Sequence, residues 1–243
     1  MLSTTINTST LANLLDRDPD VRWQTNGYSS NTASVITFTP SASKNVSRIA
    51  LVNHNLKDFI LFYDGATANT FVLSGYNTTA TLFTTNSQTN SYFNVATQAV
   101  TSISLLMRGA QTADTERLIG DLYIGDAYFR FEHNPSAKNY KPKPEEKSFK
   151  HEMSDGGEVK YFLKEKFNAD IVMDYVSLTE RANFRTVYKE HLPFVFVPYA
   201  NTSSWDGDMY EVNWSNSFDF LALETESLAV GYKGVIKLSE TPV

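Results

Sequence analysis

The chain has 243 residues, a net charge of −6 and a hydrophobic content of 42%, which is enough for a packed core. Its acidic balance argues against nucleic acid or an anionic membrane as a binding partner, and no apolar stretch approaches the ~20 residues of a membrane helix. The absence of cysteine excludes disulfides, thiolate metal sites and cysteine nucleophiles. The first residues, MLSTTINTST, have neither a basic region nor an apolar run, so we expect no signal peptide and synthesis in a cytoplasm.

The stretch NLLDRDPDVRWQTNG, residues 13–27, is the first candidate site because it gathers charged residues around a tryptophan. Alternating carboxylates at Asp16, Asp18 and Asp20 suit calcium, which prefers clustered oxygen ligands. An EF-hand loop needs glycine at its sixth position and glutamate at its twelfth, where this stretch has valine and glycine. An EF-hand is therefore excluded, and a calcium loop of another type stays open.

The alternative for the same stretch is a structural corner. Tryptophan is largely buried on average, so Trp23 would close the end of a β-sandwich. Asp16 and Arg22 would then pair their charges and fix the loop, while Asp18 and Pro19 would form its turn. We favour this structural interpretation, because the segments that follow have the pattern of an all-β domain.

Eight segments of the first half predict short strands. They are rich in Val, Ile, Thr, Phe and Tyr, and Asn, Gly and Ser separate them at roughly ten-residue intervals, which is typical of a sandwich or barrel. The predicted strands are residues 34–39, 48–53, 59–63, 70–74, 79–85, 91–96, 100–108 and 118–125.

A change of composition near residue 128 predicts two domains, 1–127 and 128–243. Residues 1–128 carry 7 Lys/Arg and 9 Asp/Glu, whereas the shorter remainder carries 14 and 18. Residues 132–157 hold three prolines and many charges, so we expect an exposed connection or a long hairpin arm. A rarer possibility is an extension that docks on a neighbouring subunit.

The second domain begins with a clear strand pattern. In EVKYFLKEKFNADIVMDYV, residues 158–176, apolar and polar residues alternate, which indicates a half-buried antiparallel strand or pair of strands. A helix is predicted over about 177–192, where Ser177 and Glu180 have the spacing of a capping box. Further strands are predicted at 194–199, 209–214, 217–224 and 228–238. The fold class is therefore mainly β, with a second β-sandwich flanked by one α-helix.

No catalytic constellation emerges from the chain. The histidines His54, His133, His151 and His191 form no zinc motif, and there is no nucleophile elbow and no glycine-rich phosphate loop. No carboxylate pair stands out as an acid–base couple. We therefore predict no catalytic residues, no cofactor and no enzymatic activity, and we interpret His54 as a hydrogen-bonded loop residue.

Three motifs of the first half resemble the discoidin family of galactose-binding-like domains. They are NLLDRDPDVRWQT, VSRIALVNHNL and LIGDLYIGDAY, and together they span about residues 10–127. The resemblance implies a jelly-roll-like β-sandwich whose loops bind sugars, lipids or proteins, or are merely structural. Asp121 stands where the family commonly has glutamate, and the loops match no subgroup, so no sugar contact carries over.

The second half resembles the minor tail proteins of long-tailed phages. The likeness lies in GDLYIGDAYFRFEHNP and SDGGEVKYFLKEKFNADIVMDYVS, followed by a helix and FVFVPY. It implies a tail-tube-like domain in a virion tail-tip or distal tail protein. Copies would form a ring, hexameric by resemblance, that contacts tube and hub proteins and lets genomic DNA pass through its lumen. The alternative is a carbohydrate-binding module or host-attachment adaptor with a glycan as partner.

Overall fold

The chain is mainly β, with one α-helix among the described residues, as the sequence predicts. The computed structural model describes residues 2–4, 10–16, 21–25, 33–57, 59–65, 69, 71, 89–107, 116–126, 130–132, 135–136, 138–153, 157–198, 209–225 and 228–241. No helix in this described part has the length and apolar character needed to cross a membrane.

Contacts between Cα atoms divide the chain into two compact units. The first unit comprises residues 1–128 with 197–209 and residue 243, and the second comprises 129–196 with 210–242. The predicted boundary at residues 127 and 128 falls outside the described residues, so the domain limits 1–127 and 128–243 stay a prediction.

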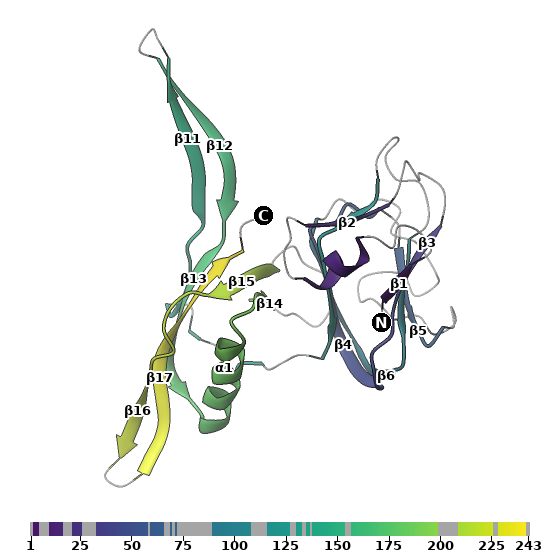
Figure 1. The fold of residues 1–243 in the computed structure, drawn as a ribbon. Coiled ribbons are helices and arrows are strands. Elements are labelled where there is room, and N and C mark those ends of the chain that lie inside the picture. Colours follow the sequence, from purple (N-terminus) through teal and green to yellow (C-terminus); the bar gives the residue numbers. More distant parts are fainter. Residues whose placement is uncertain are drawn as a thin grey trace. The chain divides into compact units, whose positions relative to one another are not determined.

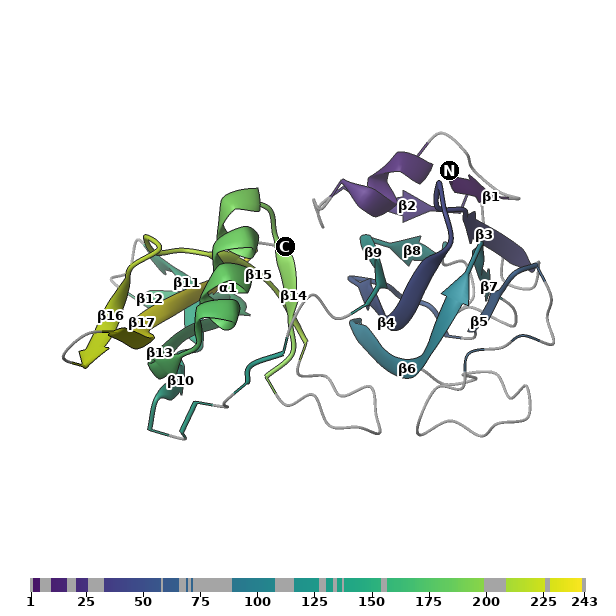
Figure 2. The same cartoon turned by 90° about the horizontal axis from the view of Figure 1, so that it is seen from below.

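The first unit contains two antiparallel sheets of the sandwich type (Figures 1 and 2). One sheet has the order β1-β3-β7-β5, the other has the order β6-β4-β9, and β2 pairs separately with β8. The elements of this unit are β1 (Leu2–Thr4), the 3-10 helix η1 (Leu11–Leu15), β2 (Trp23–Gln24), β3 (Ser34–Phe38), β4 (Lys44–Val52), β5 (Phe59–Tyr63), β6 (Ser91–Val100), β7 (Ile103–Met107), β8 (Leu118–Ile119) and β9 (Asp121–Gly125).

Alternating side chains of the two sheets form one core. The register places Leu61, Leu105 and Ile36 in a row across the first sheet. Phe93, Ile49 and Ile124 form the corresponding row of the second sheet. Five of these residues belong to the same hydrophobic cluster and Ile124 packs against it, so the inward faces of both sheets are covered by the unit's own side chains. Of the eight predicted strands, 79–85 and nearly all of 70–74 lie outside the described residues.

The second unit is built on one six-stranded antiparallel sheet with the order β10-β13-β17-β15-β14, in which β16 also pairs with β17. Strand β17 is long, and it pairs with β16 over its first half and with β15 at its end. The elements are β10 (Tyr140–Pro142), β11 (Glu145–Glu152), β12 (Glu158–Lys166), β13 (Asn168–Val176), α1 (Leu178–Glu190), β14 (Phe194–Phe196), β15 (Tyr210–Trp214), β16 (Phe220–Thr225) and β17 (Leu228–Glu240).

Helix α1 covers one face of this sheet (Figure 2). Its Phe184 is fully buried, and the ring lies 5.6 Å from Phe220, 5.7 Å from Phe131 and 6.2 Å from Trp214 between centroids. Residues of β13 alternate accordingly, because Ala169, Ile171, Met173 and Val176 are buried towards the helix. The opposite face of the sheet, which we call the outer face, has no helix against it in the part of the chain that is described.

Strands β11 and β12 form a hairpin, Glu145–Lys166, that pairs with no other strand among the described residues (Figure 1). We call this hairpin the arm. It begins inside the predicted range 132–157 and extends beyond it, because β12 supplies its second strand. The chain then continues through Phe167 directly into β13.

Candidate functional site

The described residues around Trp23 include part of the first unit's core. Trp23 is 0% exposed and pairs with Ile119 across β2 and β8. Leu11 and Leu14 of η1 are buried in the same cluster. The side-chain amide of Asn13 donates to the backbone carbonyl of Arg22 at 3.1 Å, which ties η1 to the start of β2.

The charged residues of this stretch are only partly described. Asp16 is exposed and Arg22 partly exposed, whereas Asp18 and Asp20 lie outside the described residues. Neither the Asp16–Arg22 pair nor the calcium loop is tested, and both stay predictions. Elsewhere among the described residues, no three His, Cys, Asp or Glu side chains lie close enough together to hold a metal ion.

His54 and Ser91 form a buried pair that superficially resembles catalytic machinery. The His54 Nε2 lies 2.8 Å from the Ser91 Oγ, and the His54 Nδ1 accepts a hydrogen bond from the Leu56 amide at 3.2 Å. Because Nδ1 accepts, the neutral ring carries its proton on Nε2 and donates it to Ser91. Burial, aided by the positive charge of Lys57, lowers the pKa of His54 from 6.5 to about 4. At neutral pH the ring is therefore uncharged and donates to Ser91, and the pair holds the loop after β4 against β6.

Arg117 is a buried charge that the sequence does not reveal. It is 1% exposed, and its guanidinium donates to the Ser34 hydroxyl at 2.9 Å. Its backbone amide donates to the Thr25 hydroxyl at 3.1 Å, and its carbonyl accepts from the Thr25 amide at 3.0 Å. These bonds join β2, β3 and β8, so its role is structural. In the segment ADTERLIG, neighbouring charges make the position look solvent-exposed.

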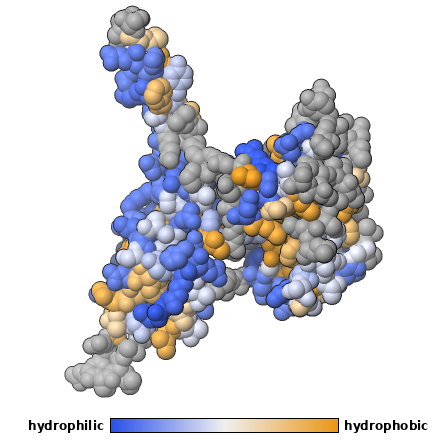
Figure 3. Space-filling view, viewed as in Figure 1, coloured by the Kyte–Doolittle hydropathy of each residue, from blue (hydrophilic) through white to orange (hydrophobic). Residues whose placement is uncertain are grey.

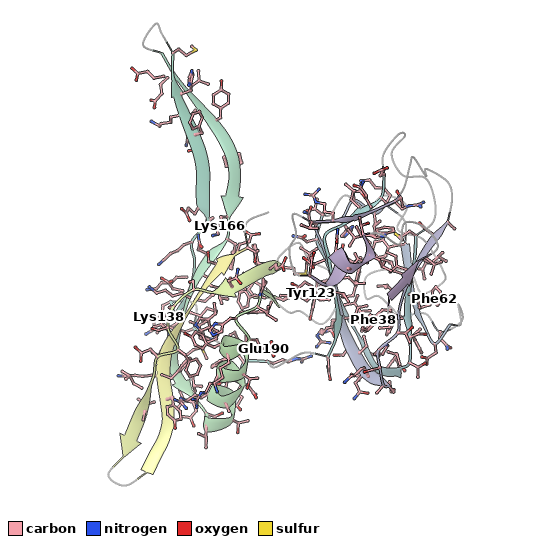
Figure 4. The ribbon with its side chains drawn as sticks, viewed as in Figure 1. Phe38, Phe62, Tyr123, Lys138, Lys166 and Glu190 are labelled. Carbon is pink, nitrogen blue, oxygen red and sulfur yellow. The ribbon has the colours of Figure 1, made fainter. Side chains whose placement is uncertain are left out.

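A cleft of about 270 Å³ opens on the first unit beside the edge strand β9. Figure 4 labels two of its aromatic residues, Phe38 and Tyr123. Asp121, which is 1% exposed, also lines it. The full lining is Leu14, Leu15, Phe38, Asp121, Leu122, Tyr123 and Ile124. The lining is mainly apolar, and the alternation of β9 puts Asp121 and Tyr123 on the face of the strand opposite Leu122 and Ile124, which pack in the core.

The arm exposes aromatic side chains on one face. Phe149 and Tyr161 face each other in the strand register, are 55% and 53% exposed, and stack with ring centroids 6.5 Å apart. His151, two residues along the same face, stacks on Phe149 at 6.4 Å. We call Phe149, His151 and Tyr161 the arm face. Figure 4 shows side chains of the arm standing clear of the other elements drawn in the second unit.

The opposite face of the arm carries ion pairs. Lys150 pairs with Glu158 at 2.7 Å, and Lys160 pairs with Glu146 at 2.6 Å. Phe162 is exposed on this side as well, nearer to Lys166 at the base of the arm. The arm is therefore amphipathic, with one mainly aromatic face and one mainly charged face.

The outer face of the sheet changes character along its length. Near the arm it is polar, and its strand register brings together Lys141, Asn168, Asp170, Asn213, Lys237 and Ser239. Towards β16 it is mainly apolar, and around Lys233 lie Val172, Tyr175, Leu221, Leu223 and Val235, which we call the sheet patch. The Tyr175 ring lies over Gly231, where a Cβ atom would come within 2.4 Å of it.

Comparisons with known proteins do not assign the chain to a family. No family model and no curated protein matches it. Solved structures that resemble it include chitosan-binding module 1 derived from a chitosanase/glucanase of Paenibacillus sp. IK-5, at 10% identity and TM-score 0.39. That match covers 52% of this chain and 94% of the module.

Two further structures resemble about half of the chain. CpGH89CBM32-6 from Clostridium perfringens matches at 18% identity and TM-score 0.40, covering 52% of this chain and 93% of its own. A pectin-binding carbohydrate-binding module matches at 17% identity and TM-score 0.38, covering 52% and 90%. At such scores these likenesses carry no argument about function, and no comparison supports the resemblance to phage tail proteins.

Proposed function

We propose that the chain is a non-enzymatic structural subunit that assembles with copies of itself. The observation that carries the proposal is the amphipathic arm, because a two-stranded hairpin is at best marginally stable by itself in water. Its exposed Phe149 and Tyr161 are placed where no other part of the described chain covers them. Exposed aromatic surface of this kind typically marks a protein–protein interface.

The finer setting of the proposal is a ring at the tail tip or baseplate of a long-tailed phage. The ring, a hexamer by resemblance, extends the tail tube and connects it to the host-recognition apparatus. This setting rests on the motifs quoted above for the second half of the chain. The polar end of the outer face, with Lys141, Asp170 and Lys237, is a surface suited to a water-filled lumen.

The test is the mass and shape of the purified chain. Light scattering coupled to size-exclusion chromatography should give a closed oligomer, and negative-stain microscopy should show rings. A monomer at every concentration would contradict self-assembly. Mass spectrometry of purified virions separately tests the tail setting, since a subunit that forms rings but is absent from virions has another structural role.

A second candidate function is carbohydrate binding by the first unit, alone or as part of a host-attachment adaptor. The observation behind it is the β9 cleft, where the partly exposed Tyr123 offers an aromatic ring for stacking on a sugar. A glycan array tests this candidate directly. Tyr123→Ala should abolish any binding and Tyr123→Phe should retain the stacking part of it, whereas an array without signal removes the candidate.

A further inference from the structure

The second unit exposes two apolar surfaces that the same chain cannot bring together. The arm face lies on β11 and β12, and the sheet patch lies at the other end of β13, beside β16. Tyr161 and Tyr175 stand fourteen residues apart on the consecutive strands β12 and β13. At ~3.3 Å per extended residue they are separated by up to about 46 Å. Figure 1 places the arm and β16 at opposite ends of this unit.

Both surfaces are exposed enough to need a cover. Phe149 and Tyr161 keep about half of the ~150–250 Å² that an aromatic side chain can bury. On the sheet patch, Leu221 is 61% exposed and Tyr175 is 41% exposed. Figure 3 shows hydrophobic surface, in orange, on the arm and over the β16–β17 end of the second unit.

The two surfaces also complement each other chemically. Lys233 projects from the middle of the sheet patch, directly opposite Leu221 in the strand register. The arm face offers a stacked pair of aromatic rings, and its own ion pairs lie on the other side of the hairpin. An ammonium group over such rings gains a cation–π attraction, which strengthens as the interface excludes water.

We propose that the arm face of one copy docks on the sheet patch of a second copy. The occupant is another copy of this chain because each copy carries both halves of the interface, so a single contact type covers both surfaces. Such a head-to-tail contact is heterologous, and repeated contacts of this kind close into a ring when the rotation between copies allows it. This inference rests on the proposed self-assembly and identifies the two surfaces that would mediate it.

Two matched variants separate the halves of this interface. Phe149→Glu with Tyr161→Glu disables the arm face, and Leu221→Glu with Lys233→Glu disables the sheet patch. All four side chains are exposed, so both variants should fold, which circular dichroism and thermal unfolding check. Lys189→Glu with Leu192→Glu is the control, because it makes the same kind of change at exposed positions outside both surfaces.

Light scattering should find each interface variant monomeric and the control assembled like the wild type. An equimolar mixture of the two interface variants should form a 1:1 dimer, since one intact arm face then meets one intact sheet patch. Assembly of either variant alone would overturn the inference while leaving self-assembly intact. So would two monomeric variants whose mixture stays monomeric. A monomeric wild type would overturn the proposed function as well.

Cross-linking supplies a second measurement that does not depend on lost affinity. The chain has no cysteine, so His151→Cys with Leu223→Cys introduces a unique pair of thiols. The two positions are too far apart to react within one chain, and oxidation should therefore link copies into a ladder on a denaturing gel. Recovery of monomers only, from an assembled sample, would overturn the proposed contact.

Discussion

The two units use the same kind of strand to different ends. In the first unit, Ile49 of β4 is 0% exposed because it packs in one cluster with side chains of the opposite sheet. In the second unit, Tyr161 of β12 belongs to an equally regular alternation, yet it is 53% exposed. The difference shows that period-two alternation specifies a strand with one apolar and one polar face. Whether the apolar face is buried depends on other segments of the chain.

The largest effect on stability is expected when a large buried side chain is removed from the core of the first unit. Trp23→Ala should lower the free energy of unfolding of the first unit by about 3–5 kcal/mol, because it leaves a large cavity in a closed core. Hydrogen exchange measured peptide by peptide should show that amides of the first unit lose protection. Amides of the second unit should keep theirs. We expect any binding or assembly activity of the second unit to persist.

Leu15→Ala is the control for this prediction, since Leu15 lies in the same stretch but is 48% exposed. Its effect should stay within about 0.5 kcal/mol. A normally stable Trp23→Ala protein would contradict the structural interpretation of the stretch. The stretch 13–27 would then be a candidate binding site again, with calcium as the first ligand to test.

Most of the fold, and little of the candidate site, follows from the sequence. Regular alternation and turn residues indicate the strands of the sandwich, and the Ser177 spacing indicates where α1 begins. The pattern of 158–176 also allows a pair of strands, which the structure resolves as β12 and β13. The sequence pattern does not reveal that only β13 is buried against the helix. Val159 and Tyr161 of β12 fit the same apolar alternation as Ile171 and Met173 of β13.

Long-range contacts set the remaining features and leave no local signal. Arg117 sits in a charged segment, yet its buried guanidinium donates to Ser34 and its backbone is held by Thr25, 83 and 92 residues away. The sheet patch likewise arises only when β13, β17 and β16 are aligned. Tyr175 can lie flat there because residue 231 is glycine, and nothing in the local sequence links the two.

A smaller effect on stability is expected when the buried His54 of the first unit is protonated at low pH. The pKa of His54 is lowered to about 4 by burial, with a further contribution from Lys57, so the unfolded chain binds a proton more readily. Stability from this residue is complete above pH 6.5 and is lost as the pH falls towards 4. The loss should reach about 3 kcal/mol, since each pKa unit is worth ~1.4 kcal/mol.

Urea unfolding of the first unit at several pH values measures this loss. Because carboxyl groups also titrate at low pH, the informative quantity is the difference between the wild type and His54→Gln. That difference should shrink between pH 7 and pH 4. A constant difference would mean that His54 is not buried as a neutral ring.

A still smaller effect is expected at the helix of the second unit. The Ser177 hydroxyl accepts a hydrogen bond from the Glu180 amide at 3.0 Å and satisfies an otherwise unpaired donor of the first turn. Ser177→Ala should therefore destabilise the second unit by about 1 kcal/mol. Ser177→Asp keeps an acceptor in place and should restore most of the loss in thermal unfolding. Equal losses in both variants would show that capping is not the role of this serine.

The smallest effect is expected on the arm, and it tests the comparison between the units most directly. Phe149→Ala should change the free energy of unfolding of the monomer by no more than about 0.5 kcal/mol, because its ring is more than half exposed. The same substitution at Phe59, which is 1% exposed in the first unit, should cost about 3–5 kcal/mol. Denaturant unfolding at low protein concentration measures both. Equal costs would mean that the chain itself covers the arm face, and the reason to assign that face to a second copy would then disappear.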